Sequence, residues 1–202
     1  MSFNLEDYIL IFRDVLPKDF CEELIHAYNL VQDDDPDKVK RENEFMNFTE
    51  LNMLNHPDFY DYSQEFIKYM QAVNHKYFET TCQNLKQRFQ CYETFEDYEA
   101  PRIKRYEPGS GIFDWHIDNA DIGSSRRALV MFWYLNDVKD GGHTIFDIGN
   151  GDTVVVKPRQ GHVACFPPHW MFPHKGDTPI SGPKYVISSY VCLPEQYGQS
   201  CD

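Results

Sequence analysis

Beyond Ala100 the chain divides into seven short runs of β-forming residues, and this pattern limits its folds more than any other feature. The runs cover residues 102–106, 115–118, 128–135, 144–147, 153–157, 163–166 and 185–193. The turn formers between them include Pro108-Gly109, Asp140-Gly141-Gly142, Gly149-Asn150-Gly151 and Pro167-Pro168. Short strands at this spacing favour an antiparallel sandwich or barrel.

The first half of the chain carries two segments with helical periodicity. Residues 16–29 place Phe20, Leu24 and Tyr28 on one face. We expect Asp19 to cap this helix. Residues 58–85 have apolar and aromatic side chains mostly three or four apart, with no Gly or Pro, and predict a longer helix capped by Asp58. A helix with a single apolar stripe is expected to lie against one face of a β unit.

We predict one domain for the 202 residues, because 42% apolar composition supplies a core and no linker separates the halves. Residues 1–99 would form a mainly helical support region, and residues 100–194 the β core. The whole chain, 1–202, would then be a single catalytic or binding unit.

Charge and composition exclude several function classes. A net charge of −13 argues against nucleic acid or an anionic membrane as the main partner, since both attract clustered Lys and Arg. The longest apolar run, residues 128–135, is far shorter than the roughly 20 residues of a membrane helix. The N-terminus lacks the pattern of a signal peptide, and the six Cys form no C-x-x-C pair. We expect a cytoplasmic protein with free thiols; the sequence does not indicate its oligomeric state.

His116-Ile117-Asp118 is the most informative short motif of the β-rich half. Side chains two apart on a strand share a face, about 7 Å apart along the chain, so imidazole and carboxylate would converge as two ligands of one metal ion. A second tripeptide of this kind, His56-Pro57-Asp58, precedes a helical pattern and indicates a helix start. No Gly-x-Ser-x-Gly, P-loop or Cys-based zinc motif supports a serine hydrolase, an ATPase or a zinc protein.

Three later histidines compete as the third ligand: His162, His169 and His174. Lys184 follows His174 by ten residues, at the head of the last β run, and the other two histidines lack a basic residue at that distance. A cation beside a metal suits a dicarboxylate that chelates at one end and forms an ion pair at the other. With His174, the set becomes two histidines and one carboxylate, as in non-haem Fe(II) oxygenases.

These residues lie within a longer series of motifs between about Arg105 and Val191. The motifs are Arg105-Tyr106-x-x-Gly109, His116-x-Asp118-Asn119, Arg127, Tyr134-Leu135-Asn136-Asp137, Gly141-Gly142-x-Thr144-x-Phe146, Pro158-x-x-Gly161, Phe166, and His174-x-Gly176 followed by Lys184. Through them the chain resembles the 2-oxoglutarate- and Fe(II)-dependent dioxygenases, and among these the prolyl 4-hydroxylase-like branch. The resemblance implies an α+β, mainly β fold: a double-stranded β-helix (jelly roll, cupin-like) supported by N-terminal helices, with the metal in its mouth.

The resemblance also implies roles for individual residues. His116, Asp118 and His174 would hold Fe(II), and Lys184 would pair with the distal carboxylate of 2-oxoglutarate. O2 would be the second co-substrate, succinate and CO2 the products, and ascorbate an optional reductant.

One ammonium group is a single point charge, so further donors to the same carboxylate are expected. Tyr134 and Tyr106 match family positions that supply such donors, and Ser188 would face the same way as Lys184 along its strand. For Arg127 we prefer a structural ion pair. Phe113 stands where many prolyl hydroxylases have a second Tyr, which leaves the substrate open.

The branch resemblance favours a prolyl residue in a peptide or protein as the substrate. A small molecule or free amino acid is the competing substrate class, and a nucleic-acid base or sugar is disfavoured by the net charge. A jelly roll that binds a metal ion without catalysing a reaction is the alternative outside the enzyme class.

Overall fold

The computed structural model describes residues 4–81 and 97–194. The helices in this part are η1 (Leu5–Tyr8), α1 (Lys18–Leu30), η2 (Pro57–Phe59) and α2 (Tyr60–Thr81). The strands are β1 (Leu10–Phe12), β2 (Lys38–Glu42), β3 (Met46–Asn52), β4 (Asp97–Tyr98), β5 (Arg102–Tyr106), β6 (Ile112–His116), β7 (Arg127–Tyr134), β8 (Thr144–Asp147), β9 (Thr153–Val156), β10 (Val163–Phe166), β11 (His174–Gly176) and β12 (Lys184–Cys192). Among these residues, no helix has the length and apolar character needed to cross a membrane.

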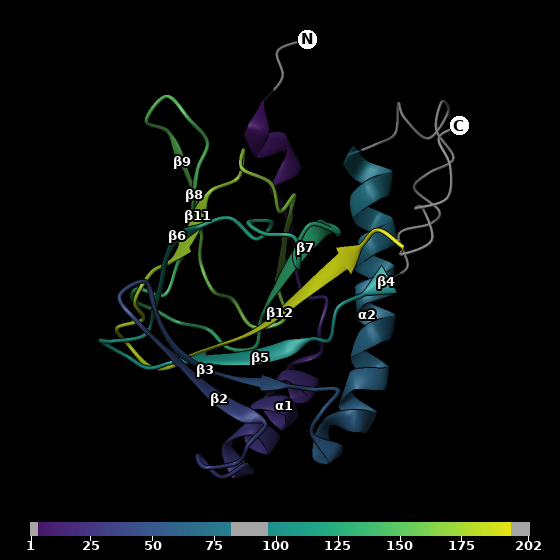
Figure 1. Cartoon of the computed structure of the whole chain (residues 1–202), viewed down its shortest axis with the longest axis vertical. Coiled ribbons are helices and arrows are strands. Elements are labelled where there is room, and N and C mark those ends of the chain that lie inside the picture. Colours follow the sequence, from purple (N-terminus) through teal and green to yellow (C-terminus); the bar gives the residue numbers. More distant parts are fainter. Residues whose placement is uncertain (1–3, 82–96, 195–202) are drawn as a thin grey trace.

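The described strands form one antiparallel sheet in the order β1-β10-β7-β12-β5-β3-β6-β11-β8-β9, with β2 on β3 and β4 on β12. The sheet curls, so that β6, β8, β9 and β11 stand apart from β12, β5 and β3 in Figure 1. Helices α1 and α2 lie outside the curl, on the side of β5 and β12 (Figure 1). The antiparallel β architecture expected from the sequence is therefore confirmed.

Strands β7 and β12 are buried on both faces, which explains the continuous apolar run of β7 after Arg127 and the mostly apolar sequence of β12. Side chains alternate along a strand. On β12, Ile187 and Val191 join the core beneath the helices, together with Leu24 of α1 and Phe66 of α2. Val186 and Tyr190 point the other way, into the interior of the curled sheet. The interior is thus a second apolar compartment.

Four strands of the sheet, β1, β2, β3 and the two-residue β4, come from residues 1–99. The sequence did not predict them, and they extend the β unit beyond residues 100–194. In β2 all residues but Lys38 are exposed, so the strand has no apolar alternation to reveal it. Strand β3 pairs with both β5 and β6 and connects the two parts of the curled sheet.

The helix starts differ in detail from those expected. Pro17 is the N-cap of α1, and Asp19 lies inside the first turn, where a carboxylate is favoured by the helix dipole. Asp58 is likewise not a cap: His56 caps η2 and its ring accepts a hydrogen bond from the Asp58 amide. The expected end of the second helix at residue 85 lies outside the described residues.

Phe66 on α2 packs edge-on against Trp133 of β7, with ring centroids 4.9 Å apart, and both side chains are fully buried. We expect Phe66→Ala to lower the free energy of unfolding by about 3–5 kcal/mol, because it leaves a cavity between helix and sheet. Tyr60→Ala, at an exposed position of the same helix, should cost less than about 0.5 kcal/mol. Urea denaturation measures both, and similar losses in the two variants would contradict this packing.

Candidate metal and co-substrate site

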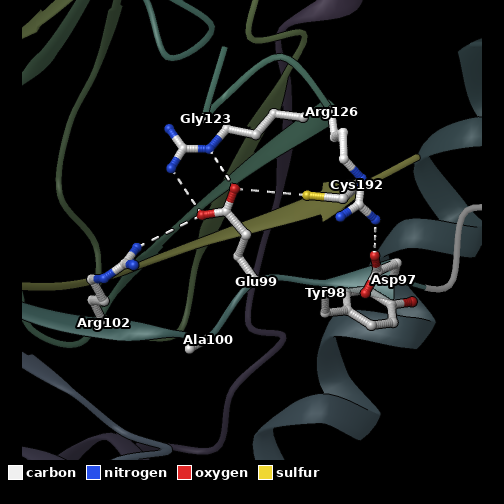
Figure 2. Close-up of a pocket in the computed structure, with 9 residues that line it drawn as sticks. Asp97, Tyr98, Glu99, Ala100, Arg102, Gly123, Arg126 and Cys192 are labelled. Carbon is white, nitrogen blue, oxygen red and sulfur yellow. Dashed lines mark hydrogen bonds and ion pairs between the residues drawn. The ribbon is translucent and has the colours of Figure 1, made fainter. Parts of the chain in front are cut away.

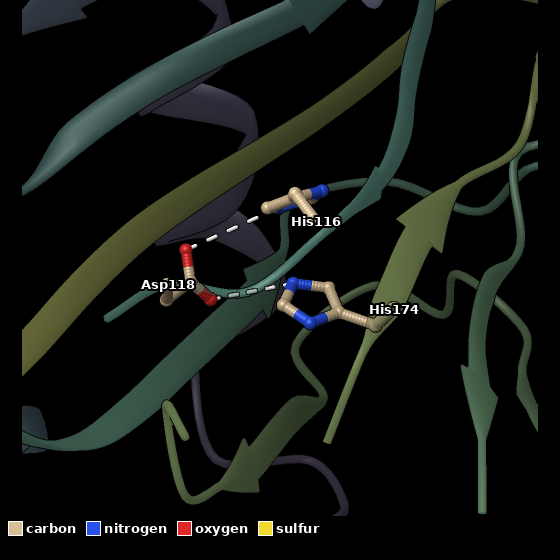
Figure 3. A group of neighbouring side chains, drawn as sticks. All are labelled: His116, Asp118 and His174. Atoms are coloured by element: carbon tan, nitrogen blue, oxygen red, sulfur yellow. Dashed lines mark ion pairs between the residues drawn. The ribbon is translucent and has the colours of Figure 1, made fainter. Parts of the chain in front are cut away.

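Three side chains from two distant segments meet inside the mouth of the curled sheet. His116 ends β6, His174 begins β11, and the two residues face each other across the β6–β11 pair. Asp118 lies beside them, and ligand atoms of all three residues lie within 4.8 Å of one another. Figure 3 shows the three side chains pointing toward a common centre. The structure brings together the predicted trio, and His162 and His169 are not part of the group.

The donor atoms of this trio fit a metal ion. Nε2 of His116, Nε2 of His174 and Oδ2 of Asp118 are buried and make no hydrogen bond, although His174 Nε2 and Asp118 Oδ2 lie only 3.3 Å apart. Buried polar atoms without partners are rare in folded proteins and call for an explanation. A cation bound between these atoms would satisfy all three.

Backbone carbonyls orient both rings. His116 Nδ1 lies 2.6 Å from the Asp114 carbonyl oxygen, and His174 Nδ1 lies 3.1 Å from that of Phe172. Only a protonated Nδ1 can donate to a carbonyl, so each Nε2 keeps its lone pair for a metal. Phe113 stacks on the His116 ring at 3.6 Å between centroids and restricts its rotation.

The electrostatics of the trio favour the protonation states that bind metal. Burial, and second the neighbouring His174, lowers the pKa of His116 to about 4, so this imidazole is neutral near pH 7. Burial would raise the pKa of Asp118, but His174 and His116 outweigh it and hold that pKa below its usual range.

Asp118 does not share the strand of His116, contrary to the prediction of a strand over residues 115–118, because β6 ends at His116. Two contacts hold Asp118 beyond the strand end. The Arg127 guanidinium donates to its carbonyl at 2.8 Å, and the Tyr190 hydroxyl donates to its Oδ1 at 3.0 Å. Asp118 reaches the centre through these contacts, not through strand alternation.

Arg127 is itself fixed by an ion pair with Glu99. Its Nε and Nη2 donate to the two carboxylate oxygens at 2.7 and 2.8 Å, which confirms the expected structural ion pair. Figure 2 shows the Glu99 carboxylate between the guanidinium groups of Arg127 and Arg102, with the Cys192 thiol also close to it. These residues line a pocket of about 500 Å³. The Arg127 guanidinium also stacks over the Tyr190 ring at 3.7 Å. Glu99, Arg127 and Tyr190 thus form a support for Asp118.

Lys184 is 1% exposed and projects from the first position of β12 into the same interior. Its Nζ donates to the Gly142 carbonyl at 3.0 Å and lies 4.6 Å from the centre of the Tyr106 ring. Burial lowers the pKa of Lys184 to about 7. A side chain at Gly176 would begin 3.5 Å from this ammonium, so the glycine leaves space beside it. An anionic ligand in that space would stabilise the charged form of Lys184.

Strand β11 sets the spacing between this ammonium and the trio. Gly176 follows His174 by two residues, roughly 7 Å along the strand. Thr144 lies opposite Gly176 on β8, and its hydroxyl is 2.8 Å from that of Tyr134. Lys184 and Tyr134 therefore lie near the Gly176 end of β11, and the metal-binding atoms lie near its His174 end.

Tyr106 and Ser188, the other residues predicted to contact the co-substrate, differ in their surroundings. The Tyr106 ring is buried under Lys184. Ser188 is fully buried, and its Oγ has no hydrogen-bond partner, so it is free to contact a ligand. The sequence reasoning missed Tyr190 and Glu99. Tyr190 lies six residues after Lys184 on the same strand face, a signal that could have found it; no pattern links Glu99 to Asp118.

The part of the chain that forms this site matches the sequence model of a known protein family. Residues 101–192 match the model described as the 2OG-Fe(II) oxygenase superfamily. The match covers 92 of the 202 residues and indicates the family to which this segment is similar. The matched segment contains the trio, Lys184 and Tyr134, and agrees with the resemblance that the motifs indicated. Among curated proteins, no sequence matches this chain.

Solved structures similar to this chain include three prolyl hydroxylases. The Pseudomonas putida prolyl-4-hydroxylase has a TM-score of 0.72 at 17% identity, over 93% of each chain. The Trichoplax adhaerens prolyl hydroxylase, in complex with a peptide fragment of hypoxia inducible factor, has a TM-score of 0.68 at 15% identity, over 92% of this chain and 84% of that one. A viral collagen prolyl hydroxylase of Paramecium Bursaria Chlorella virus-1 has a TM-score of 0.60 at 18% identity, over 93% and 97%. The predicted double-stranded β-helix fold is confirmed.

Glu99 fixes Arg127, and Arg127 holds Asp118, so the affinity of the site for a metal ion should depend on Glu99. We expect Glu99→Gln to weaken Mn²⁺ binding about 10-fold, because the looser Arg127 would no longer fix the Asp118 carbonyl. Glu107→Gln, which changes a more exposed partner of Arg105, should leave the affinity within about two-fold. Titration calorimetry measures both constants. Equal affinities for Glu99→Gln and the unsubstituted protein would show that this support does not act on the metal site.

Proposed function

We propose that the protein is a 2-oxoglutarate- and Fe(II)-dependent oxygenase that hydroxylates a prolyl residue in a peptide or protein, converting 2-oxoglutarate and O2 to succinate and CO2. The observation that carries the proposal is the trio of buried, unpartnered donor atoms, with the buried ammonium of Lys184 in the same interior of the curled sheet. Within the 2OG-Fe(II) oxygenase superfamily this arrangement suits Fe(II) and a dicarboxylate co-substrate.

One group of residues would bind the metal ion, and a second group would bind 2-oxoglutarate. His116, Asp118 and His174 would hold Fe(II), which when bound supplies the activation of O2. Lys184 would pair with the distal carboxylate of 2-oxoglutarate. The hydroxyls of Tyr134 and Ser188 would donate further hydrogen bonds to the co-substrate, and Tyr106 would pack against it, since all three side chains are buried in the same interior.

Aromatic side chains would exclude water from the reaction. Phe113 covers His116, and the rings of Phe146 and Phe166 lie 5.5 and 4.8 Å from the His174 ring. A dry pocket strengthens the ion pair at Lys184 and protects reactive species from side reactions.

Exposed apolar side chains near the trio support a peptide or protein substrate. Trp115 precedes His116, Ile122 follows Asp118 by four residues, and Trp170 precedes His174 by four. Their exposed fractions are 45%, 93% and 75%, and the segments of the last two touch, since the Asn119 amide donates to the Pro168 carbonyl. Exposed apolar groups beside a site are typical of a surface that binds a partner. The Trichoplax adhaerens relative, solved with a peptide, supports the same class.

The direct test is mass spectrometry of a proline-containing peptide library incubated with the protein, Fe(II), 2-oxoglutarate and ascorbate. We expect a gain of one oxygen on proline, with matching formation of succinate. His174→Ala should abolish both, because it removes a metal ligand, whereas His26→Ala, on the exposed face of α1, should retain both.

Two outcomes would contradict the proposal. Succinate formation by His174→Ala at the wild-type rate would refute the metal assignment. If free amino acids stimulate 2-oxoglutarate turnover and no peptide gains oxygen, the prolyl assignment fails and a small-molecule hydroxylase takes its place.

A further inference from the structure

A second buried lysine lies in the interior of the sheet and has no part in the roles described above. Lys104 is on β5, two residues before Tyr106, and is 6% exposed. Because side chains alternate along a strand, Lys104 and Tyr106 point to the same side of β5, into the interior of the curled sheet. Its Nζ makes no hydrogen bond or ion pair with any residue among 4–81 and 97–194.

The surroundings of this ammonium are apolar rings. Nζ lies 4.9, 5.5 and 6.0 Å from the ring centres of Phe48, Phe113 and Phe132. Two of these rings adjoin the metal-binding histidines: Phe113 stacks on His116, and Phe132 lies 6.4 Å from the His174 ring. Lys104 therefore lies on the side of the metal-binding histidines, whereas Lys184 lies near Gly142 and Tyr106.

The acidic groups that influence Lys104 are engaged elsewhere. Glu50 faces Lys104 across the β3–β5 pair, but its carboxylate accepts from Arg41 at 2.8 Å. Asp118 belongs to the trio. Burial lowers the pKa of Lys104, because the interior disfavours its charged form. Cation–π contacts offset part of this cost and provide no anion.

We propose that Lys104 binds the carboxylate of 2-oxoglutarate that lies toward the metal ligands, so that two lysines hold the two ends of the co-substrate. The inference rests on the proposed function. In the β5–β12 register, Lys184 pairs with Tyr106 and Val186 with Lys104. The two lysines therefore arise one strand apart and offset by two residues, roughly 7 Å along the strands, a spacing that suits a short dicarboxylate. Separate cations at the two ends would select a dicarboxylate and set its direction in the pocket.

The test compares two ligands and three variants in protein loaded with Mn²⁺. 2-Oxoglutarate has both carboxylates, whereas 2-oxopentanoate has only the one next to the keto group. Lys104→Met should weaken binding of both ligands by the same factor, about ten-fold or more, since both keep the carboxylate that it contacts. Lys184→Met should mainly remove the preference for 2-oxoglutarate. Lys139→Met, at an exposed lysine, should change neither affinity.

Thermal unfolding of the ligand-free variants separates binding from structure. A methionine fits among the three phenylalanine rings, so Lys104→Met should have a Tm at or above that of the unsubstituted protein, because it removes a buried unpaired charge. A structural lysine would give the opposite result: a lower Tm and unchanged affinities.

Unchanged affinities in Lys104→Met, or a loss confined to 2-oxoglutarate, overturn the assignment of Lys104 to the carboxylate that lies toward the metal ligands. Failure of the unsubstituted protein to bind 2-oxoglutarate overturns the proposed function itself, and this inference with it. Titration calorimetry distinguishes the two failures, because only the second appears without any substitution.

Discussion

Side-chain alternation along strands that are buried on both faces is the constraint on which the rest of the structure depends. On β12 one set of side chains packs beneath α1 and α2, and the other set lines the interior of the curled sheet. The interior set includes Lys184 at one end and Tyr190, which contacts Asp118, toward the other. A shift of one residue in the β12 register would place Lys184 in the helix-side core and Ile187 in the pocket. The helix-side packing therefore fixes the position of the site.

The interior holds several groups that lower the stability of the ligand-free protein. Nε2 of His116 and of His174, and Oδ2 of Asp118, lack hydrogen bonds, and two lysines are buried among aromatic rings. Each such group costs free energy on burial. The large apolar core beneath the helices offsets that cost. A metal ion and an anionic co-substrate would satisfy these groups, so their binding is expected to stabilise the fold.

The sequence predicted most strands of the second half, because their alternating or continuous apolar patterns and Gly- or Pro-containing turns act locally. It missed the three-residue strand β11 and placed β6 too late in the chain. Strands β5, β8 and β10 begin and end where expected. It did not predict β2, a mostly exposed strand, or the position of Asp118. Asp118 is placed by Arg127 and Tyr190, which are nearby only in the folded chain. Lys104 lies two residues before Tyr106, so strand alternation alone places both side chains on the same face. Its three aromatic neighbours come from three other strands, and the sequence does not predict them.

The central claim is that the unpartnered atoms of His116, Asp118 and His174 form a single metal site. Its most direct measurement is an anomalous difference map from a crystal soaked in Mn²⁺. The account predicts one strong peak per chain, within bonding distance of both Nε2 atoms and of an Asp118 carboxylate oxygen. A peak elsewhere, or no peak between these residues at saturating Mn²⁺, would contradict it.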